Sequence, residues 1–133
     1  MAKAPRRGPY ICGIDAAFDV LNGKWKGLIL WELDVHGVLR FSELRRGMPG
    51  VSEKMLTQHL REMEEDSLVH RKVHAEVPPR VEYSLTEHGR TLNRALAPLG
   101  VWGDQRMTRE GSALIDTTAP SPATATPESP AHV

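Results

Sequence analysis

The sequence predicts a mainly α fold that carries one small β-hairpin, an α+β arrangement. Apolar residues recur at helical spacing along residues 14–33 and 41–66, and again after residue 86. Between the last two helical stretches, alternating segments at 68–74 and 80–85 flank a Pro-Pro pair, as in a hairpin. The order helix, tight turn, helix, hairpin, helix predicts a winged helix-turn-helix, whose usual work is reading duplex DNA.

Two helices and a short strand are expected ahead of the turn. The first helix carries apolar residues at helical spacing, namely Ile14, Phe18 and Leu21. Asn22-Gly23 supplies its stop, and a second helix begins near Lys24 and breaks at His36-Gly37. One face of this second helix is expected to hold Trp25, Leu28, Ile29 and Leu33. We expect residues 38–40 to form a short strand that pairs with the hairpin.

A short helix, a turn and a well-capped helix follow. Residues 41–46 form the short helix, and residues 47–50 form a compact turn because Gly and Pro both interrupt helices. Ser52 is a strong N-cap for the next helix. Val51 precedes the cap and is placed to pack on Leu56 in the first turns of that helix.

The helix from Glu53 to about Asp66 has two expected faces. The core face is formed by Leu56, Leu60 and Met63. A rotation of about 100° per residue places a polar set nearly opposite, formed by Lys54, Gln58 and Arg61 with Thr57 at its flank. The outward face is expected to become acidic at Glu62 and Glu65, so the N-terminal half is the surface suited to DNA.

The hairpin and the last helix complete the expected domain. Alternating apolar residues define one hairpin face, namely Val69, Val73, Val81, Tyr83 and Leu85. Residues 75–79 make a stiff tip, and the basic residues that flank it are expected to reach a minor groove or the DNA backbone: Lys72, His74 and Arg80. Thr86 caps a final helix that contains Leu92, Leu96, Leu99 and Trp102.

Length and composition limit the organisation of the chain. Its 133 residues allow one domain with a single hydrophobic core. We expect a flexible arm at 1–11, the folded domain at 12–110, and a disordered tail rich in Pro, Ala and Thr at 111–133. No apolar run approaches the roughly 20 residues that cross a bilayer, and the N-terminus lacks the apolar segment of a secretory signal. The chain is therefore expected in the cytoplasm, associated with the nucleoid and not with a membrane.

Charge and cysteine content are consistent with this placement. Seventeen basic and seventeen acidic residues give a formal net charge of zero, so a basic surface depends on where the charges lie and not on their sum. The one cysteine, Cys12, excludes an internal disulfide framework. The histidines show no metal-ligand spacing, and no cofactor motif is present, so neither a metal nor a cofactor is expected.

Four segments together resemble the HxlR-type transcriptional regulators, a bacterial winged-helix group within the MarR-like superfamily. They are GKWKGLILWEL at 23–33, RFSELRR at 40–46, MLTQHLREME at 55–64 and VEYSLTEHGR at 81–90. The similarity runs from Cys12 to about Gly103. It implies a homodimer whose first and last helices form the interface, with two recognition helices and two wings on a palindromic promoter site.

The resemblance also implies where DNA is contacted. Such positions fall on the turn and helix from Ser52 to Arg61 and on the wing. Together with the residue patterns, the candidate DNA-contacting set is Arg40, Ser42, Ser52, Lys54, Met55, Thr57, Gln58, Arg61, Lys72, His74 and Arg80. Arg40 is expected to position a phosphate, while Arg45 or Arg46 is free to pair with a nearby glutamate instead.

Cys12 matches the cysteine that precedes the first helix in this family, and in some members that thiol senses oxidants or electrophiles. Here Gly13 stands where a proline commonly follows the cysteine, which loosens the local backbone. Two roles stay open: a small packing residue at the dimer interface, which we prefer, and a redox sensor. Two roles also stay open for three tryptophans, namely Trp25, Trp31 and Trp102. They either anchor the core or the interface, which we prefer, or line a pocket for a small-molecule effector.

The leading functional hypothesis is a sequence-specific, dimeric transcriptional regulator, most simply a repressor, responsive to redox change or a small ligand. The alternative is a winged-helix interaction and dimerisation module that does not bind DNA, which the zero net charge favours slightly. The outward set Lys54, Gln58 and Arg61 argues against that alternative. An enzyme is not expected, because no catalytic motif is present.

Overall fold

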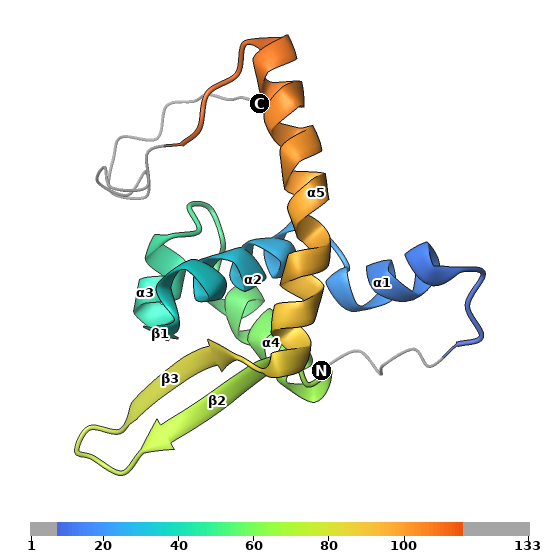
Figure 1. Ribbon diagram of the computed structural model, residues 1–133. Helices are drawn as coiled ribbons and strands as arrows, with labels where there is room; N and C mark the ends of the chain where they lie inside the picture. The colour runs from blue at the N-terminus through green and yellow to red at the C-terminus, as the bar shows by residue number, and fades with distance from the viewer. Residues whose placement is uncertain (1–7, 116–133) are drawn as a thin grey trace.

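The computed structural model describes residues 8–115, and these residues form helices around one small sheet (Figure 1). The elements are, in chain order, α1 (Gly13–Leu21), α2 (Lys24–His36), β1 (Val38–Arg40), α3 (Phe41–Arg46), α4 (Glu53–Glu65), β2 (Val69–His74), β3 (Arg80–Leu85) and α5 (Glu87–Glu110). The predicted mainly α fold with a β-wing is confirmed. Residues 1–7 and 116–133, which hold most of the expected arm and tail, lie outside the described residues.

The sheet is antiparallel with strand order β1-β3-β2. In the hairpin, Val69 lies opposite Leu85 and Val73 opposite Val81, so the apolar sets meet on one face as expected. Leu39 of β1 lies opposite Tyr83, which confirms the predicted pairing of residues 38–40 with the hairpin. The hairpin extends away from the helices (Figure 1), and residues 69–85 are called the wing below.

The hydrophobic core joins α2, α3 and α4 to the base of the wing. The predicted core face of α4 is confirmed, since Leu56, Leu60 and Met63 are at most 2% exposed. The predicted face of α2 is wrong at one position, because Leu28 is 41% exposed. The buried stripe of α2 is instead Lys26, Ile29, Leu30 and Leu33, which is the i, i+3, i+4, i+7 pattern of one helix face.

The helix-turn-helix is held by its turn and its cap. Met48 in the turn is 1% exposed, and its carbonyl accepts a hydrogen bond from the amide of Val51 at 3.1 Å. Gly50 has φ +98°, a conformation that side chains with a Cβ rarely adopt. The hydroxyl of Ser52 accepts from the amide of Met55 at 3.0 Å, so the predicted N-cap is confirmed. This cap fixes the direction in which α4 leaves the turn.

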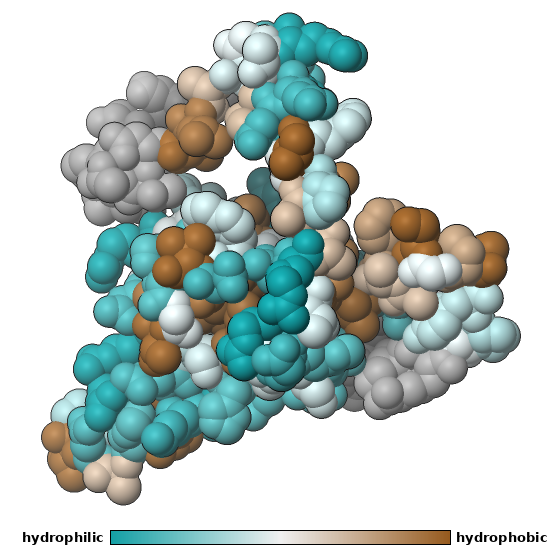
Figure 2. Space-filling view, in the orientation of Figure 1, coloured by the Kyte–Doolittle hydropathy of each residue, from teal (hydrophilic) through white to brown (hydrophobic). Residues whose placement is uncertain are grey.

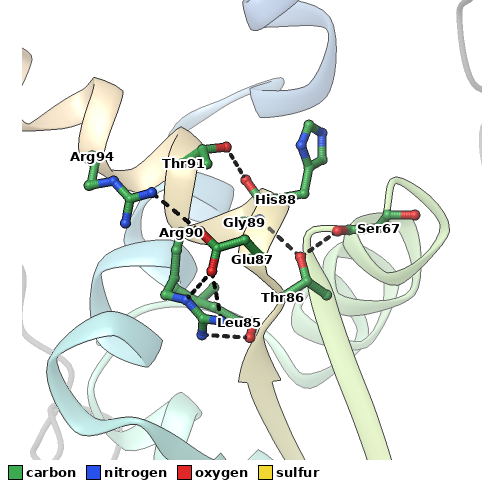
Figure 3. A network of polar contacts seen from close by, with 9 residues as sticks. All are labelled: Ser67, Leu85, Thr86, Glu87, His88, Gly89, Arg90, Thr91 and Arg94. Carbon is green, nitrogen blue, oxygen red and sulfur yellow. Dashed lines mark hydrogen bonds and ion pairs between the residues drawn. The ribbon is translucent and has the colours of Figure 1, made fainter.

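A polar network joins the end of the α4 region to the start of α5 (Figure 3). The Thr86 hydroxyl donates to the carbonyl of Ser67 at 2.5 Å and accepts from the amide of Gly89 at 2.9 Å, which confirms Thr86 as the cap. The amide of Thr86 donates to the carbonyl of Leu68 at 3.1 Å. Through these bonds, α5 and the wing leave the core in fixed directions.

Large apolar side chains are exposed on α1 and α5 in particular. On α1 and the residue before its cap these are Ile11, Ile14 and Phe18, exposed by 91%, 63% and 59%. On the part of α5 that extends beyond the core they are Leu99, Val101 and Trp102. Apolar surface is visible over both helices (Figure 2). Within residues 8–115, no helix is both long and apolar enough to span a membrane.

Candidate nucleic-acid interface

The outward face of α4 presents polar and basic side chains to solvent. Lys54, Thr57 and Arg61 are exposed. Ser52 and Met55 are exposed at the start of the helix, where Ser52 serves as the cap. Five of the six candidate residues on this helix and its cap are therefore exposed to solvent.

The sixth, Gln58, is half-buried at the edge of that face. Its amide nitrogen Nε2 donates to Oε2 of Glu62 at 3.2 Å. Glu62 is 8% exposed, so its expected place on an acidic outward face is wrong. The reason is that α2 packs along this side of α4 and supplies Lys26, whose Nζ lies 2.7 Å from Oε1 of Glu62.

In this region the sequence patterns did not identify Lys26, and they placed Glu62 on the wrong face of α4. Lys26 is 3% exposed, an uncommon burial for a lysine. A signal was present in the sequence, because Lys26 shares the helical spacing of Ile29 and Leu33. With Glu62 turned inward, the acids exposed near the end of α4 are Glu64 and Glu65.

The electrostatics of this buried pair follow from its contacts. Burial alone would raise the pKa of Glu62, but hydrogen bonds from Lys26 and Gln58 and the charge of Lys26 lower it below the ordinary value of 4.5. Glu62 is therefore a carboxylate at neutral pH. Burial, and then the charge of Lys26, lower the pKa of the neighbouring His59 below 6.5, so His59 is neutral there.

At the start of α3, Arg40 and Ser42 are exposed beside the helix-turn-helix. The amide of Arg40 donates to Oε1 of Glu43 at 2.7 Å, so Glu43 takes part in capping the helix. Arg45 donates from Nε to the carbonyl of Val51 at 3.4 Å. Arg45 thus braces the turn, a role different from the expected pairing with a glutamate.

The basic residues of the wing divide into two groups. His74 and Arg80 both contact Glu82, at 2.7 Å and 2.5 Å, and Arg80 also pairs with Glu76 at 2.7 Å. The hydrogen bond from His74, followed by the contacts of Arg80, lowers the pKa of Glu82 below its ordinary value. Lys72 is exposed, as are His70 and Arg71, which the sequence reading did not single out. The exposed basic side chains of the wing therefore lie on β2.

Cys12 lies at the N-cap of α1, and its side chain is exposed and free. The three tryptophans differ in burial. Trp25 packs against the core, while Trp31 and Trp102 are 55% and 59% exposed. Among residues 8–115, no three His, Cys, Asp or Glu side chains are grouped so that they could hold a metal ion.

Comparison with known proteins agrees with this geometry. A model of the HxlR-like helix-turn-helix family matches residues 20–111. The HTH-type transcriptional regulator YdeP of Bacillus subtilis is 44% identical over 98 residues, which cover 74% of this chain and 76% of YdeP. An HTH-type transcriptional regulator of Methanothermobacter thermautotrophicus is 47% identical over 94 residues, 71% of each chain.

Solved structures give the same result. The redox regulator HypR in its reduced form is similar with a TM-score of 0.69 and 44% identity, covering 75% of this chain and 99% of HypR. Its oxidised form gives a TM-score of 0.66 and 46% identity, covering 71% of this chain and 96% of HypR. These relatives are regulators and not enzymes. The chain belongs to the HxlR-like helix-turn-helix family and is a DNA-binding transcriptional regulator.

Proposed function

We propose that the chain acts as a homodimer that binds a palindromic promoter site in a sequence-specific manner and represses transcription from it. One observation carries the proposal. The exposed set Lys54, Thr57 and Arg61 lies on a helix that is capped by Ser52, preceded by a tight turn and followed by a wing with basic side chains on β2. A helix of this kind enters the major groove with its N-terminal half, and the wing lies on the adjoining backbone or minor groove.

Affinity and specificity then come from different residues. Exposed Lys and Arg side chains, with Lys54, Lys72 and Arg40 foremost, bind phosphates, which makes affinity strongly dependent on salt. Thr57, Gln58 and Arg61 reach base edges, where one good bidentate contact discriminates by about 1–3 kcal/mol. His74 and Arg80 contribute to DNA binding only after leaving their glutamate partners, so they are the weaker members of the set.

The experiment is fluorescence anisotropy on DNA from upstream of the chain's own gene and the adjacent gene, with scrambled DNA of equal length, at one near-physiological salt concentration. We expect a preference of about 10³ or more for one upstream fragment. Arg61→Ala should reduce that preference, while Lys72→Ala should weaken binding to both fragments alike. Arg109→Ala, a loss of the same charge in the last turn of α5, is the control and should change neither. Equal binding to both fragments by the unaltered protein would contradict the proposal.

Dimerisation is proposed on the exposed apolar residues of α1 and α5. An exposed apolar patch commonly marks an interaction surface, and two such helices far apart in the chain are suited to a twofold interface. Repression is proposed because a dimer bound across a promoter obstructs transcription from it. A reporter fused to the bound promoter should be transcribed more strongly when the regulator gene is deleted, and lower transcription would identify an activator.

A redox response through Cys12 is proposed in addition, on two observations. The thiol is exposed at the start of α1, and the chain is similar to a redox regulator solved in both oxidised and reduced forms. Oxidant should change the DNA affinity of the unaltered protein and leave that of Cys12→Ser unchanged. If oxidant changes the DNA affinity of both proteins equally, Cys12 is not the sensor and its role is packing. The proposal includes no catalytic role, cofactor or membrane partner, and it places the chain in the cytoplasm with its DNA.

A further inference from the structure

The amide of Gln58 is held in one orientation by its contact with Glu62. Glu62 is a carboxylate, which accepts hydrogen bonds and donates none. The group that faces it at 3.2 Å must therefore be the nitrogen Nε2 of Gln58 and not the carbonyl oxygen. One N–H of Gln58 is used in this contact. The carbonyl oxygen and the second N–H remain for another partner.

Glu62 is itself fixed from the neighbouring helix. Lys26 of α2 lies 2.7 Å from Oε1, and the two side chains are 4% and 10% exposed. Glu62 thus divides its oxygens, with Oε1 on Lys26 and Oε2 on Gln58. If the carboxylate of Glu62 turned away, the buried charge of Lys26 would be left uncompensated. Such a rotation would therefore cost much free energy.

We propose that Lys26 and Glu62 determine which base Gln58 reads, by holding its amide with a carbonyl oxygen and one N–H available, and that this base is adenine. The inference rests on the proposed insertion of α4 into the major groove. Adenine presents an acceptor, N7, beside a donor, the N6 amino group, and matches this pair. Guanine presents two acceptors, N7 and O6, so one of them would face the Gln58 carbonyl oxygen, which is also an acceptor, and no hydrogen bond would form there. Gln58 is the reading residue, and Lys26 and Glu62 are positioning residues.

The substitution Glu62→Gln tests this orientation directly. Lys26 has donors only, so it will claim the carbonyl oxygen of the new amide and turn the new NH₂ toward Gln58. Gln58 must then turn its carbonyl inward and its own NH₂ outward. An outward NH₂ is a donor that suits the acceptors of guanine, so the variant should lose its adenine preference and gain one for guanine.

The experiment is selection of bound duplexes from a randomised library by the full chain, followed by affinity measurement on single-base-pair variants. Gln58→Ala first identifies the base pair that Gln58 reads. At that base pair, Glu62→Gln should reduce the preference for adenine by about 10- to 100-fold, with other positions unchanged. Glu65→Gln removes the same charge from an exposed position on the same helix, and should leave every base preference as it was.

The outcomes separate the inference from the proposed function. Loss of the adenine preference confined to the Gln58 base pair supports the inference. Retention of that preference, equal weakening at all positions, or a Gln58 position that is not adenine overturns it while leaving the proposed function intact. Failure of the unaltered protein to enrich any sequence overturns both. If Glu62→Gln does not fold, the double substitution Lys26→Met with Glu62→Leu removes the pair with apolar side chains of similar size, and should also lose the adenine preference.

Discussion

At the scale of single residues, the ion pair of Lys26 and Glu62 ties α4, the proposed recognition helix, to α2. Both residues are less than 10% exposed, so neither charge is solvated by bulk water. Removing one partner of such a pair leaves the other charge buried without compensation. Replacing both by apolar residues of similar volume avoids that cost. The pair therefore contributes more to the placement of α4 than to net stability.

This difference gives the first prediction. Lys26→Met should lower the free energy of unfolding by about 3–5 kcal/mol, because the Glu62 carboxylate is left unpaired in the interior. The double substitution Lys26→Met with Glu62→Leu should recover most of the loss. Urea unfolding of the two variants and the unaltered protein measures both effects. A double variant as unstable as the single one would show that the pair itself is a source of stability.

His59 provides a prediction about pH. Its Nδ1 is buried without a hydrogen-bond partner, and burial and the charge of Lys26 lower its pKa below 6.5 in the folded state. The unfolded chain takes up a proton near pH 6.5, whereas the folded chain binds it only at lower pH. Protons therefore favour the unfolded state, and stability that is complete above pH 6.5 declines as the pH falls below that value.

The measurement is thermal unfolding between pH 5 and pH 8 for the unaltered protein and for His59→Gln, which cannot titrate in this range. Between pH 7 and pH 5 the unaltered protein should lose more stability than the variant, and the difference isolates His59 from the other titrating groups. Identical pH profiles would mean that His59 is as easily protonated in the folded state as in the unfolded one.

At the scale of elements, the start of α5 shows why the segment VEYSLTEHGR carries a glycine. A Cβ at Gly89 would overlap the carbonyl of Leu68, which is backbone and cannot move aside. Gly89→Ala should therefore force α5 away from β2 and destabilise the fold by about 1–3 kcal/mol or more. Gly27→Ala is the control, because an added Cβ meets no atom within 4 Å there, and alanine is the better helix former. Thermal unfolding that ranks Gly89→Ala at or above the unaltered protein would contradict this account.

Most elements were predictable because their signals are local. Ser52 and Thr86 cap their helices through hydrogen bonds to amides three residues on, an interaction that depends on nearby residues alone. The buried face of α2 was not predictable in full, because Leu28, Ile29 and Leu30 are all apolar and together span about 200° around the helix. The packing of α2 against α3, α4, α5 and β3 decided which of them was buried.

At the scale of the whole molecule, α1 and the end of α5 extend apolar side chains into solvent. Phe18→Glu places a charge among Ile11, Ile14 and the other residues proposed for the dimer interface, so it should convert the dimer to a monomer. Affinity for an operator with two half-sites should fall with it, because the second copy of α4 would no longer be held near the second half-site. Sedimentation equilibrium measures the mass, and anisotropy measures the affinity.

A matched control is Val77→Glu, a fully exposed valine in the loop between β2 and β3, at the end of the hairpin that extends away from the helices (Figure 1). It introduces the same charge at an exposed apolar residue and should leave the mass unchanged. A dimer that survives Phe18→Glu would remove α1 from the proposed interface, and a monomeric unaltered protein would remove the interface altogether.

The sequence by itself determined the order of the elements, the caps, the apolar face of the hairpin and the exposed set on α4, because these follow from the period of a helix, the alternation of a strand and hydrogen bonds between near neighbours. Only the tertiary structure decided that Glu62 turns inward to Lys26, that Gln58 is held by Glu62, and that His74 and Arg80 are paired with acids in the wing. Lys26 and Glu62 are far apart in the chain, and periodicity within α4 predicted the opposite side for Glu62. Because α2 packs along α4, the two charges are buried together as a pair. This is more favourable than burying either charge without its partner.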